Sequence, residues 1–142
     1  MKAKWIIAIL IVASLHCSQG DQSPAASGEK SIEITLEGPS SAPEANKAIK
    51  VDFEEGTVLD LLLKTSSQGL LKFKYSGVGE KAFVESLQGV GPAGDGESGK
   101  YWIYSINGKL SNLGVGSQTI RGGDRLKWCY LSFAERNNCA DK

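Results

Sequence analysis

Histidine is nearly absent from this chain of 142 residues, which has one histidine and three cysteines. Nucleophilic catalysis by a serine or a cysteine needs an imidazole that takes the proton. The single histidine, His16, lies at the edge of an apolar N-terminal segment, away from any candidate nucleophile. A tetrahedral zinc site of cysteine and histidine lacks ligands for the same reason. We therefore expect a protein that is not an enzyme and has no metal site.

The chain also lacks an excess of charge, because 16 basic residues face 16 acidic ones. Proteins that bind nucleic acid neutralise its phosphates with a dense basic surface. Lys72 and Lys74 merely alternate with apolar residues, as on the wet face of a strand. We expect no nucleic-acid partner.

Long apolar runs are missing except near the N-terminus, where two lysines precede the apolar residues 5–15. This layout is typical of an export signal and is too short to span a bilayer as a helix. If Cys17 is lipidated as the first mature residue, the signal covers 1–16, although His16 departs from the small residue that usually precedes such a cysteine. If cleavage instead follows Gly20, the signal covers 1–20. Both alternatives stay open.

Either route predicts an exported protein, anchored in the cell envelope through Cys17 or released as a periplasmic or secreted protein. Residues 17–30 are polar and small, which predicts a flexible tether. In an oxidising compartment the two remaining cysteines, Cys129 and Cys139, are expected to form a disulfide. It would hold the tail, 135–142, against the last strand. The alternative is two free thiols.

The spacing of apolar residues predicts strands and one helix. Apolar and polar residues alternate in 31–36 and again in 47–53, which predicts an opening hairpin with a long connection. Residues 57–66 show helical spacing, with Thr57 as N-cap and Asp60 as its capping-box partner.

Period-two alternation returns in the second half. Strands are expected at 70–75 and at 82–87, where Phe83 and Leu87 would share one face and Val84 would lie opposite. Further strands are expected at 101–106, followed by an Asn-Gly hairpin turn, and at 125–131, entered through Gly-Gly-Asp. We therefore predict an α+β domain over 31–134, with a β-grasp-like mixed sheet, one crossing helix and a C-terminal hairpin region.

Aromatic side chains and a glycine-rich loop, 89–99, are the candidates for ligand contact. On strand alternation, Trp102 and Tyr104 would face the core and Tyr101 would lie near the loop. Two carboxylates in the loop could hold a hard cation or act as an acid and a base, but a solvated polar loop is the simpler interpretation. The candidate ligand-binding residues are Tyr75, Tyr101, Trp102, Tyr104, Asp95 and Glu97.

Five motifs carry a family resemblance: GTVLDLL at 56–62, YSGVG at 75–79, FVESLQGV at 83–90, YWIYSING at 101–108 and GDRLKW at 123–128. In this order, over roughly 30–133, they resemble the transcobalamin-like C-terminal domain family, here as a standalone exported protein of bacterial type. The resemblance implies a β-grasp-related fold that, in transcobalamin and intrinsic factor, closes over cobalamin bound on a larger helical domain. No helical domain is present in this sequence, so the β-domain would offer half of such a site.

These observations lead to two hypotheses. The first is a non-enzymatic, monomeric ligand-binding module at the cell surface or in the periplasm, which requires no cofactor and takes cobalamin or another corrinoid as its ligand. The second is an adaptor domain of an envelope lipoprotein that binds protein or polysaccharide through a sheet edge or the loop 89–99. In both, a lipid on Cys17 would be the only link to the membrane.

Overall fold

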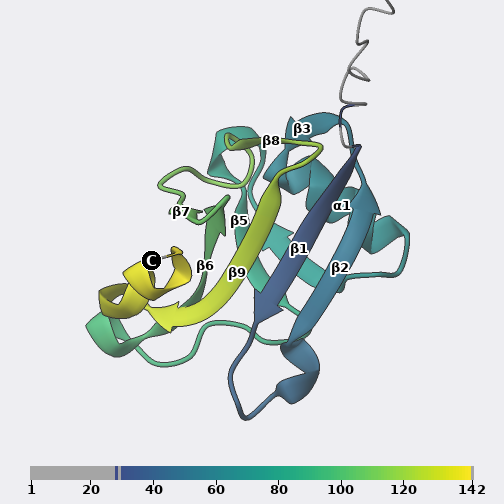
Figure 1. Ribbon diagram of the computed structural model, residues 1–142. Helices are drawn as coiled ribbons and strands as arrows, with labels where there is room; N and C mark the ends of the chain where they lie inside the picture. Colours follow the sequence, from purple (N-terminus) through teal and green to yellow (C-terminus); the bar gives the residue numbers. More distant parts are fainter. Residues whose placement is uncertain (1–27, 29, 142) are drawn as a thin grey trace, which may run out of the picture.

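The main sheet of the protein contains five strands in the order β2-β1-β9-β6-β7 (Figure 1). The computed structural model describes residue 28 and residues 30–141. The strands are β1 (Ser31–Glu37), β2 (Lys47–Asp52), β6 (Lys100–Ile106), β7 (Lys109–Leu110) and β9 (Arg125–Ser132). β1 and β9 are parallel and the other neighbours are antiparallel, so the sheet is mixed.

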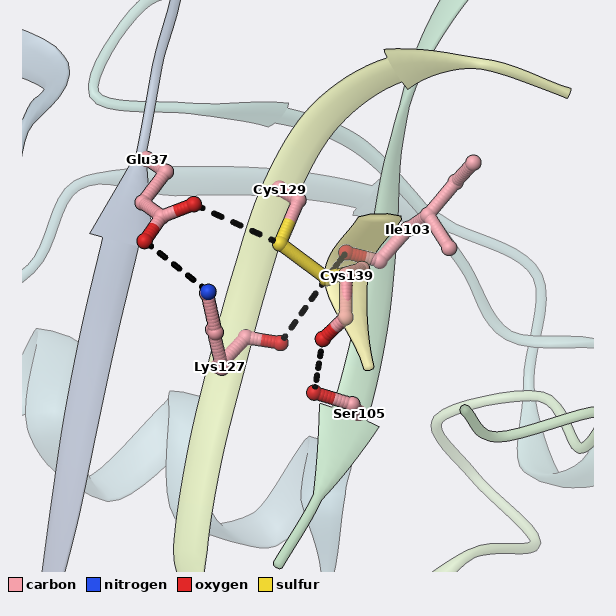
Figure 2. Close-up of a disulfide and its surroundings, with 6 residues drawn as sticks. All are labelled: Glu37, Ile103, Ser105, Lys127, Cys129 and Cys139. Carbon is pink, nitrogen blue, oxygen red and sulfur yellow. Dashed lines mark hydrogen bonds and ion pairs between the residues drawn. A yellow bond between two sulfur atoms is a disulfide. The ribbon is translucent and has the colours of Figure 1, made fainter. Parts of the chain in front are cut away.

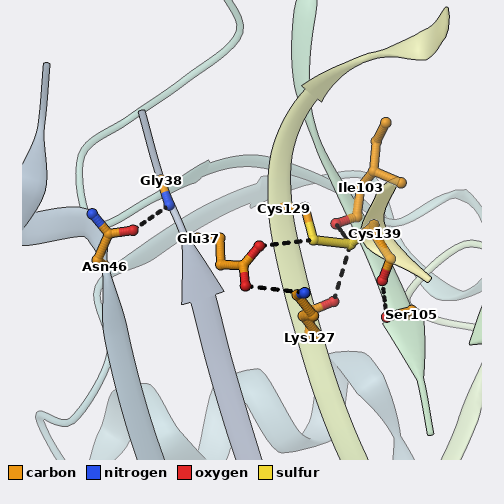
Figure 3. Close-up of polar contacts among 8 residues, drawn as sticks. All are labelled: Glu37, Gly38, Asn46, Ile103, Ser105, Lys127, Cys129 and Cys139. Atoms are coloured by element: carbon orange, nitrogen blue, oxygen red, sulfur yellow. Dashed lines mark hydrogen bonds and ion pairs between the residues drawn. A yellow bond between two sulfur atoms is a disulfide. The ribbon is translucent and has the colours of Figure 1, made fainter. Parts of the chain in front are cut away.

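The opening hairpin forms as expected, because the alternating apolar residues of β1 and β2 meet on one face. Ile32 pairs with Val51 and Ile34 with Ile49, and all four side chains are buried. Its long connection contains the short 3₁₀ helix η1 (Pro43–Ala45). Where the connection leaves β1, the backbone N–H of Gly38 donates to Oδ1 of Asn46 at 3.0 Å (Figure 3). This contact closes the base of the connection.

Helix α1 (Val58–Ser67) packs on that apolar face, behind the sheet in Figure 1. Its N-terminus has the expected capping box: Thr57 donates through N–H and Oγ1 to Oδ2 of Asp60, at 2.9 and 2.7 Å, and Asp60 N–H donates back to Oγ1 at 3.1 Å. These bonds satisfy helix N–H groups that have no partner within the helix. Gly69, with a φ of 71°, ends the helix in a conformation that suits glycine.

Two small antiparallel pairs flank the main sheet. β3 (Glu55–Thr57) pairs with β8 (Thr119–Arg121), and β4 (Phe73–Ser76) pairs with β5 (Phe83–Leu87). Strand β3 was not expected, because three residues are too few to show alternation. The remaining short 3₁₀ helices are η2 (Gly79–Lys81), η3 (Gly96–Ser98) and η4 (Phe133–Cys139).

The expected facing of β5 was wrong, because the strand contains a bulge. Lys74 pairs with Ser86 and Tyr75 with Val84, so Glu85 is passed over. An extra residue reverses the alternation beyond it. Val84 and Leu87 are therefore both buried, whereas Phe83 is 54% exposed.

The opposite face of the main sheet holds the disulfide between Cys129 on β9 and Cys139 at the end of η4 (Figure 2). The predicted pairing is confirmed, with a Cα–Cα distance of 5.7 Å. Buried Ser105 Oγ donates to the carbonyl of Cys139 at 2.7 Å. Beside the bridge, Lys127 Nζ lies 3.0 Å from a carboxylate oxygen of Glu37. The end of the chain is thereby held on β6 and β9.

The described residues thus form an α+β arrangement, mixed β-sheet with one α-helix, as the alternation predicted. None of the helices in this part of the chain has the length and apolarity that crossing a bilayer requires. Cys17, both expected ends of the export signal and most of the expected tether lie outside the described residues, so the predictions for them stay predictions.

Candidate functional site

The six candidate ligand-binding residues lie in four different places. Trp102 and Tyr104 are on the core face of β6, while Tyr101 is on the other face, against Gly99. Tyr75, on β4, stacks on Phe73 with ring centroids 5.4 Å apart. The two loop carboxylates, Asp95 and Glu97, are exposed. The structure therefore brings only Trp102 and Tyr104 together.

These two rings line two hollows, which share the four lining residues Trp102, Tyr104, Leu113 and Gly114. The outer groove, of about 470 Å³, runs beside β6 between the loop after β7 and η4, and its further walls include Phe133 and Arg136. The inner cavity, of about 150 Å³, lies over β5 and β9, and its further walls include Ala82, Phe83, Val84, Val115 and Trp128.

Hydrogen bonds from the rings hold the loops that wall these hollows. Trp102 Nε1 donates to the carbonyl of Val90 at 2.8 Å, and Tyr104 OH donates to the carbonyl of Leu113 at 2.7 Å. The Val90 bond ties the first residues of the glycine-rich loop to β6. Burial raises the pKa of Tyr104. The phenol is therefore a neutral donor that positions Leu113.

The loop between β7 and β8 is also fixed from the side of α1. The N–H groups of Val58 and Leu59, in the first turn of α1, donate to the carbonyls of Gln118 and Val115, each at 2.9 Å. Helix N-termini carry such unpaired donors, so the loop satisfies them while it is held in place. Gly116 permits a close approach to the 79–82 segment, since a Cβ there would collide with the carbonyl of Gly79. The wall containing Leu113 is thus built into the fold.

Helix η4 forms the other wall of the outer groove. The Arg136 guanidinium lies 4.1 Å from the Phe133 ring centroid and donates to the Phe133 carbonyl at 2.9 Å. Glu135 accepts from Oγ and N–H of Ser132 at 2.7 and 3.3 Å, and these bonds lower the pKa of Glu135. Phe133 is 63% exposed and Leu113 is 55% exposed. Two large apolar side chains therefore line the outer groove while remaining partly in water.

The outer edge of β6 is open at the groove. Residues of an antiparallel strand alternately direct their N–H and C=O groups toward and away from a given partner. Lys100 bonds outward to Ala93, and the Tyr104 carbonyl accepts outward from Ser111 N–H at 3.0 Å. Trp102, between them, must also direct its backbone outward, and no strand or bridge of the described residues pairs with it on that side. A backbone donor and acceptor therefore stand free at the groove.

Leu113, Phe133, Arg136 and Phe83 were not among the sequence candidates. A usable signal existed for Leu113, which is the large apolar residue in an otherwise small and polar loop, Ser-Asn-Leu-Gly. Phe133 and Arg136 gave none, because their role depends on a helix that the disulfide folds back onto β6. Phe83 was assigned to the wrong face.

A fold similar to this one occurs in a crystal structure of a protein from Ruminococcus gnavus that is provisionally described as metal binding. The match has a TM-score of 0.53 at 14% identity and covers 73% of this chain and 98% of that one, so it concerns the fold alone. In the described residues of this chain, no group of three or more histidines, cysteines, aspartates and glutamates is placed to hold a metal ion. No curated protein matches the sequence.

One family model matches residues 56–132, which run from β3 to the last residue of β9. This segment contains every lining residue of the inner cavity named above, whereas Phe133 and Arg136 of the outer groove follow directly after it. The matched family is described as a domain of unknown function, DUF4430. The chain belongs to the DUF4430 family.

Proposed function

We propose that this protein is an exported, non-enzymatic binding module whose outer groove takes a ligand with a flat apolar body and polar groups at its edge. The observation that carries the proposal is the pair of exposed apolar walls, Leu113 and Phe133, around the partly buried Trp102. Large exposed apolar side chains that gather around a hollow favour ligand contact. The free backbone donor and acceptor of Trp102 suit amide groups on the edge of such a ligand.

A corrinoid is the first ligand to test. Its macrocycle is flat and apolar and carries amide side chains, and the sequence resembles the transcobalamin-like C-terminal domains that close over cobalamin. The single helix across a mixed sheet supports a β-grasp-like fold of that kind. Export is supported by the disulfide, since such bonds persist in oxidising compartments. The perturbed carboxyl groups, Asp60 and Glu135, serve as helix caps, which favours binding over catalysis.

The test is a titration of the purified protein with cyanocobalamin, followed by visible absorption and by calorimetry. Binding through the outer groove predicts that Leu113→Asp weakens the affinity by about tenfold or more, the equivalent of roughly 1.4 kcal/mol. Leu63→Asp is the matched control, because Leu63 is 41% exposed on α1 and is not among the residues that line either hollow. Absence of any response up to millimolar cobalamin would remove the corrinoid as ligand. Equal effects of the two variants on the affinity would exclude the outer groove as the binding site.

An adaptor that binds extended peptides is the second candidate, favoured by the edge strand β2. Phe53 N–H donates to the Lys30 carbonyl, so by alternation the backbone of Ala48 points away from β1, toward the open edge. Proline is tolerated at such edge positions. Ala48→Pro removes the N–H that an added peptide strand would accept from. It should therefore abolish capture of an extended peptide and leave the cobalamin titration unchanged, with Ala48→Ser as the control. Full peptide capture by the proline variant would exclude this edge.

A further inference from the structure

The described residues that line the outer groove include one charged side chain, that of Arg136. The others are uncharged, being apolar, aromatic or small and polar, as Ser111 and Asn112 are. A hollow whose charge has a single sign attracts groups of the opposite sign. The groove is therefore complementary to a ligand that is uncharged over most of its surface and negative at one point.

Arg136 has no acidic partner in the described part of the chain. No carboxylate of these residues lies within ion-pair distance of its guanidinium. The acid beside it in the sequence, Glu135, is engaged elsewhere, because it accepts from Ser132 Oγ at 2.7 Å and lies 3.4 Å from Lys100 Nζ. The positive charge of Arg136 is therefore not neutralised within the described fold.

The guanidinium is held at the groove wall and still has free donors. It lies over the Phe133 ring, which also lines the groove, and Nη1 donates to the Phe133 carbonyl. Nε and Nη2 have no acceptor among the described residues. Neither atom of this half-buried residue is completely buried, because the one completely buried side-chain nitrogen or oxygen without a partner in the described residues is Nε1 of Trp128. A stacked guanidinium keeps its N–H groups at its edge, where one carboxylate can accept from two of them.

We propose that Arg136 is the anion-binding residue of the outer groove, and that the ligand is a small, flat, apolar molecule with one carboxylate at its edge. The carboxylate accepts from Nε and Nη2 of Arg136, while the flat body contacts the apolar walls, Leu113 and Phe133. This inference rests on the proposed function, because it assigns a charge to the ligand of the same groove. It does not depend on whether the flat body is a corrinoid.

Naphthoate and naphthamide, substituted on the same ring carbon, make a matched probe pair, because they share one flat ring system and differ chiefly in charge. The titration is made on the purified oxidised protein at slightly acidic pH, where the carboxylate is ionised and arginine Nε–H signals are visible in a ¹H–¹⁵N spectrum. We expect naphthoate to bind at least about fivefold more tightly than naphthamide, since hydrogen bonds to a charged acceptor are the stronger ones. Naphthoate should also move the Nε–H signal of Arg136. Arg121 is the internal control, because it is exposed on β8 and lines neither hollow.

Three variants separate the charge from the apolar body. Arg136→Gln assigns the signal and removes the charge, so it should abolish the preference for naphthoate. Arg121→Gln should leave the preference unchanged. Leu113→Ala shortens an apolar wall and should weaken both probes without removing the preference.

The wild-type protein decides the proposal whether or not a variant folds. Absence of naphthoate binding at millimolar concentration, equal affinities of the two probes, or an Arg136 signal that naphthoate does not move would overturn it. A preference that survives Arg136→Gln would overturn it as well. Equal affinities that both fall in Leu113→Ala would remove the carboxylate and leave the groove as the site of the proposed function. Failure of cobalamin to bind would instead remove the corrinoid and leave the naphthoate result standing.

Discussion

On one face of the main sheet, isoleucine, leucine and tryptophan side chains of β1 and β9 pack against α1; on the other, charged side chains of the same strands lie beside a disulfide. Figures 2 and 3 show the second face, with Glu37, Lys127 and Cys129 in front of the sheet. The first face is closed by apolar area drawn from residues far apart in the sequence. The second is closed by one covalent bond between residues ten apart. Stability should therefore depend on the first face globally and on the second face locally.

The sharpest test uses neighbouring residues of β1 that point to opposite faces. Leu36 is 2% exposed in the core, and Thr35 precedes it on the charged face. Leu36→Ala should lower the free energy of unfolding by about 2–5 kcal/mol because it leaves a cavity. Thr35→Ala should lower it by less than about 1 kcal/mol. Urea denaturation measures both values, and similar losses would contradict the proposed difference between the faces.

Removing the disulfide should have the next largest effect. Closure of this short loop is worth up to about 3 kcal/mol in the chain-entropy account. Reduction should lower the free energy of unfolding by that amount or less and increase amide exchange chiefly in η4 and the residues after it. Cys139→Ser should reproduce the change without reductant and show no further response to it. An equal increase of amide exchange in α1 would mean that the disulfide stabilises the whole fold and not only the second face.

The cap of α1 predicts a smaller effect and a pH dependence. Thr57→Ala should cost about 1 kcal/mol, since it removes an N-cap. The hydrogen bonds from Thr57 lower the pKa of Asp60 below its ordinary value of 3.8. A carboxyl group whose pKa is lowered by folding stabilises the fold at pH values above its pKa in the unfolded chain. That contribution is lost as the pH falls through its pKa in the folded protein. Stability should therefore decline on acidification below about pH 4. The decline should be shallower in Asp60→Asn, and an unchanged slope would exclude this role of Asp60.

The ion pair on the second face should matter least. Lys127 and Glu37 are 3.0 Å apart, with side chains 28% and 54% exposed. Partly exposed pairs contribute about 0–1 kcal/mol and are screened by salt. Glu37→Gln should change the free energy of unfolding by less than about 1 kcal/mol in low salt and by less still in high salt. A larger loss that persists in salt would show that the charged face stabilises the fold more than this comparison allows.

Much of the first face follows from local patterns. Alternation in β1 and β2, the cap at Thr57 and the Asn107-Gly108 turn, with φ angles of 50° and 75°, each depend on residues close together in the chain. The bulge at Glu85 does not follow from a local pattern, because the alternation within one strand does not show where the partner strand passes over a residue. The hollows could not be predicted either. Their walls come from segments as distant as Phe83, Leu113 and Phe133, and the unneutralised charge of Arg136 is defined only by what surrounds it.

The disulfide also has a consequence for when the binding surface exists. Helix η4 supplies Phe133 and Arg136 to the outer groove, and it is attached to the sheet through Cys139. Inside a reducing cell this bond does not persist, so the wall would be free to detach from the sheet. The inner cavity uses no residue of η4 and would already be formed. If the protein is exported as proposed, the newly made chain carries an incomplete groove. The groove would be completed only when the Cys129–Cys139 bond forms in an oxidising compartment.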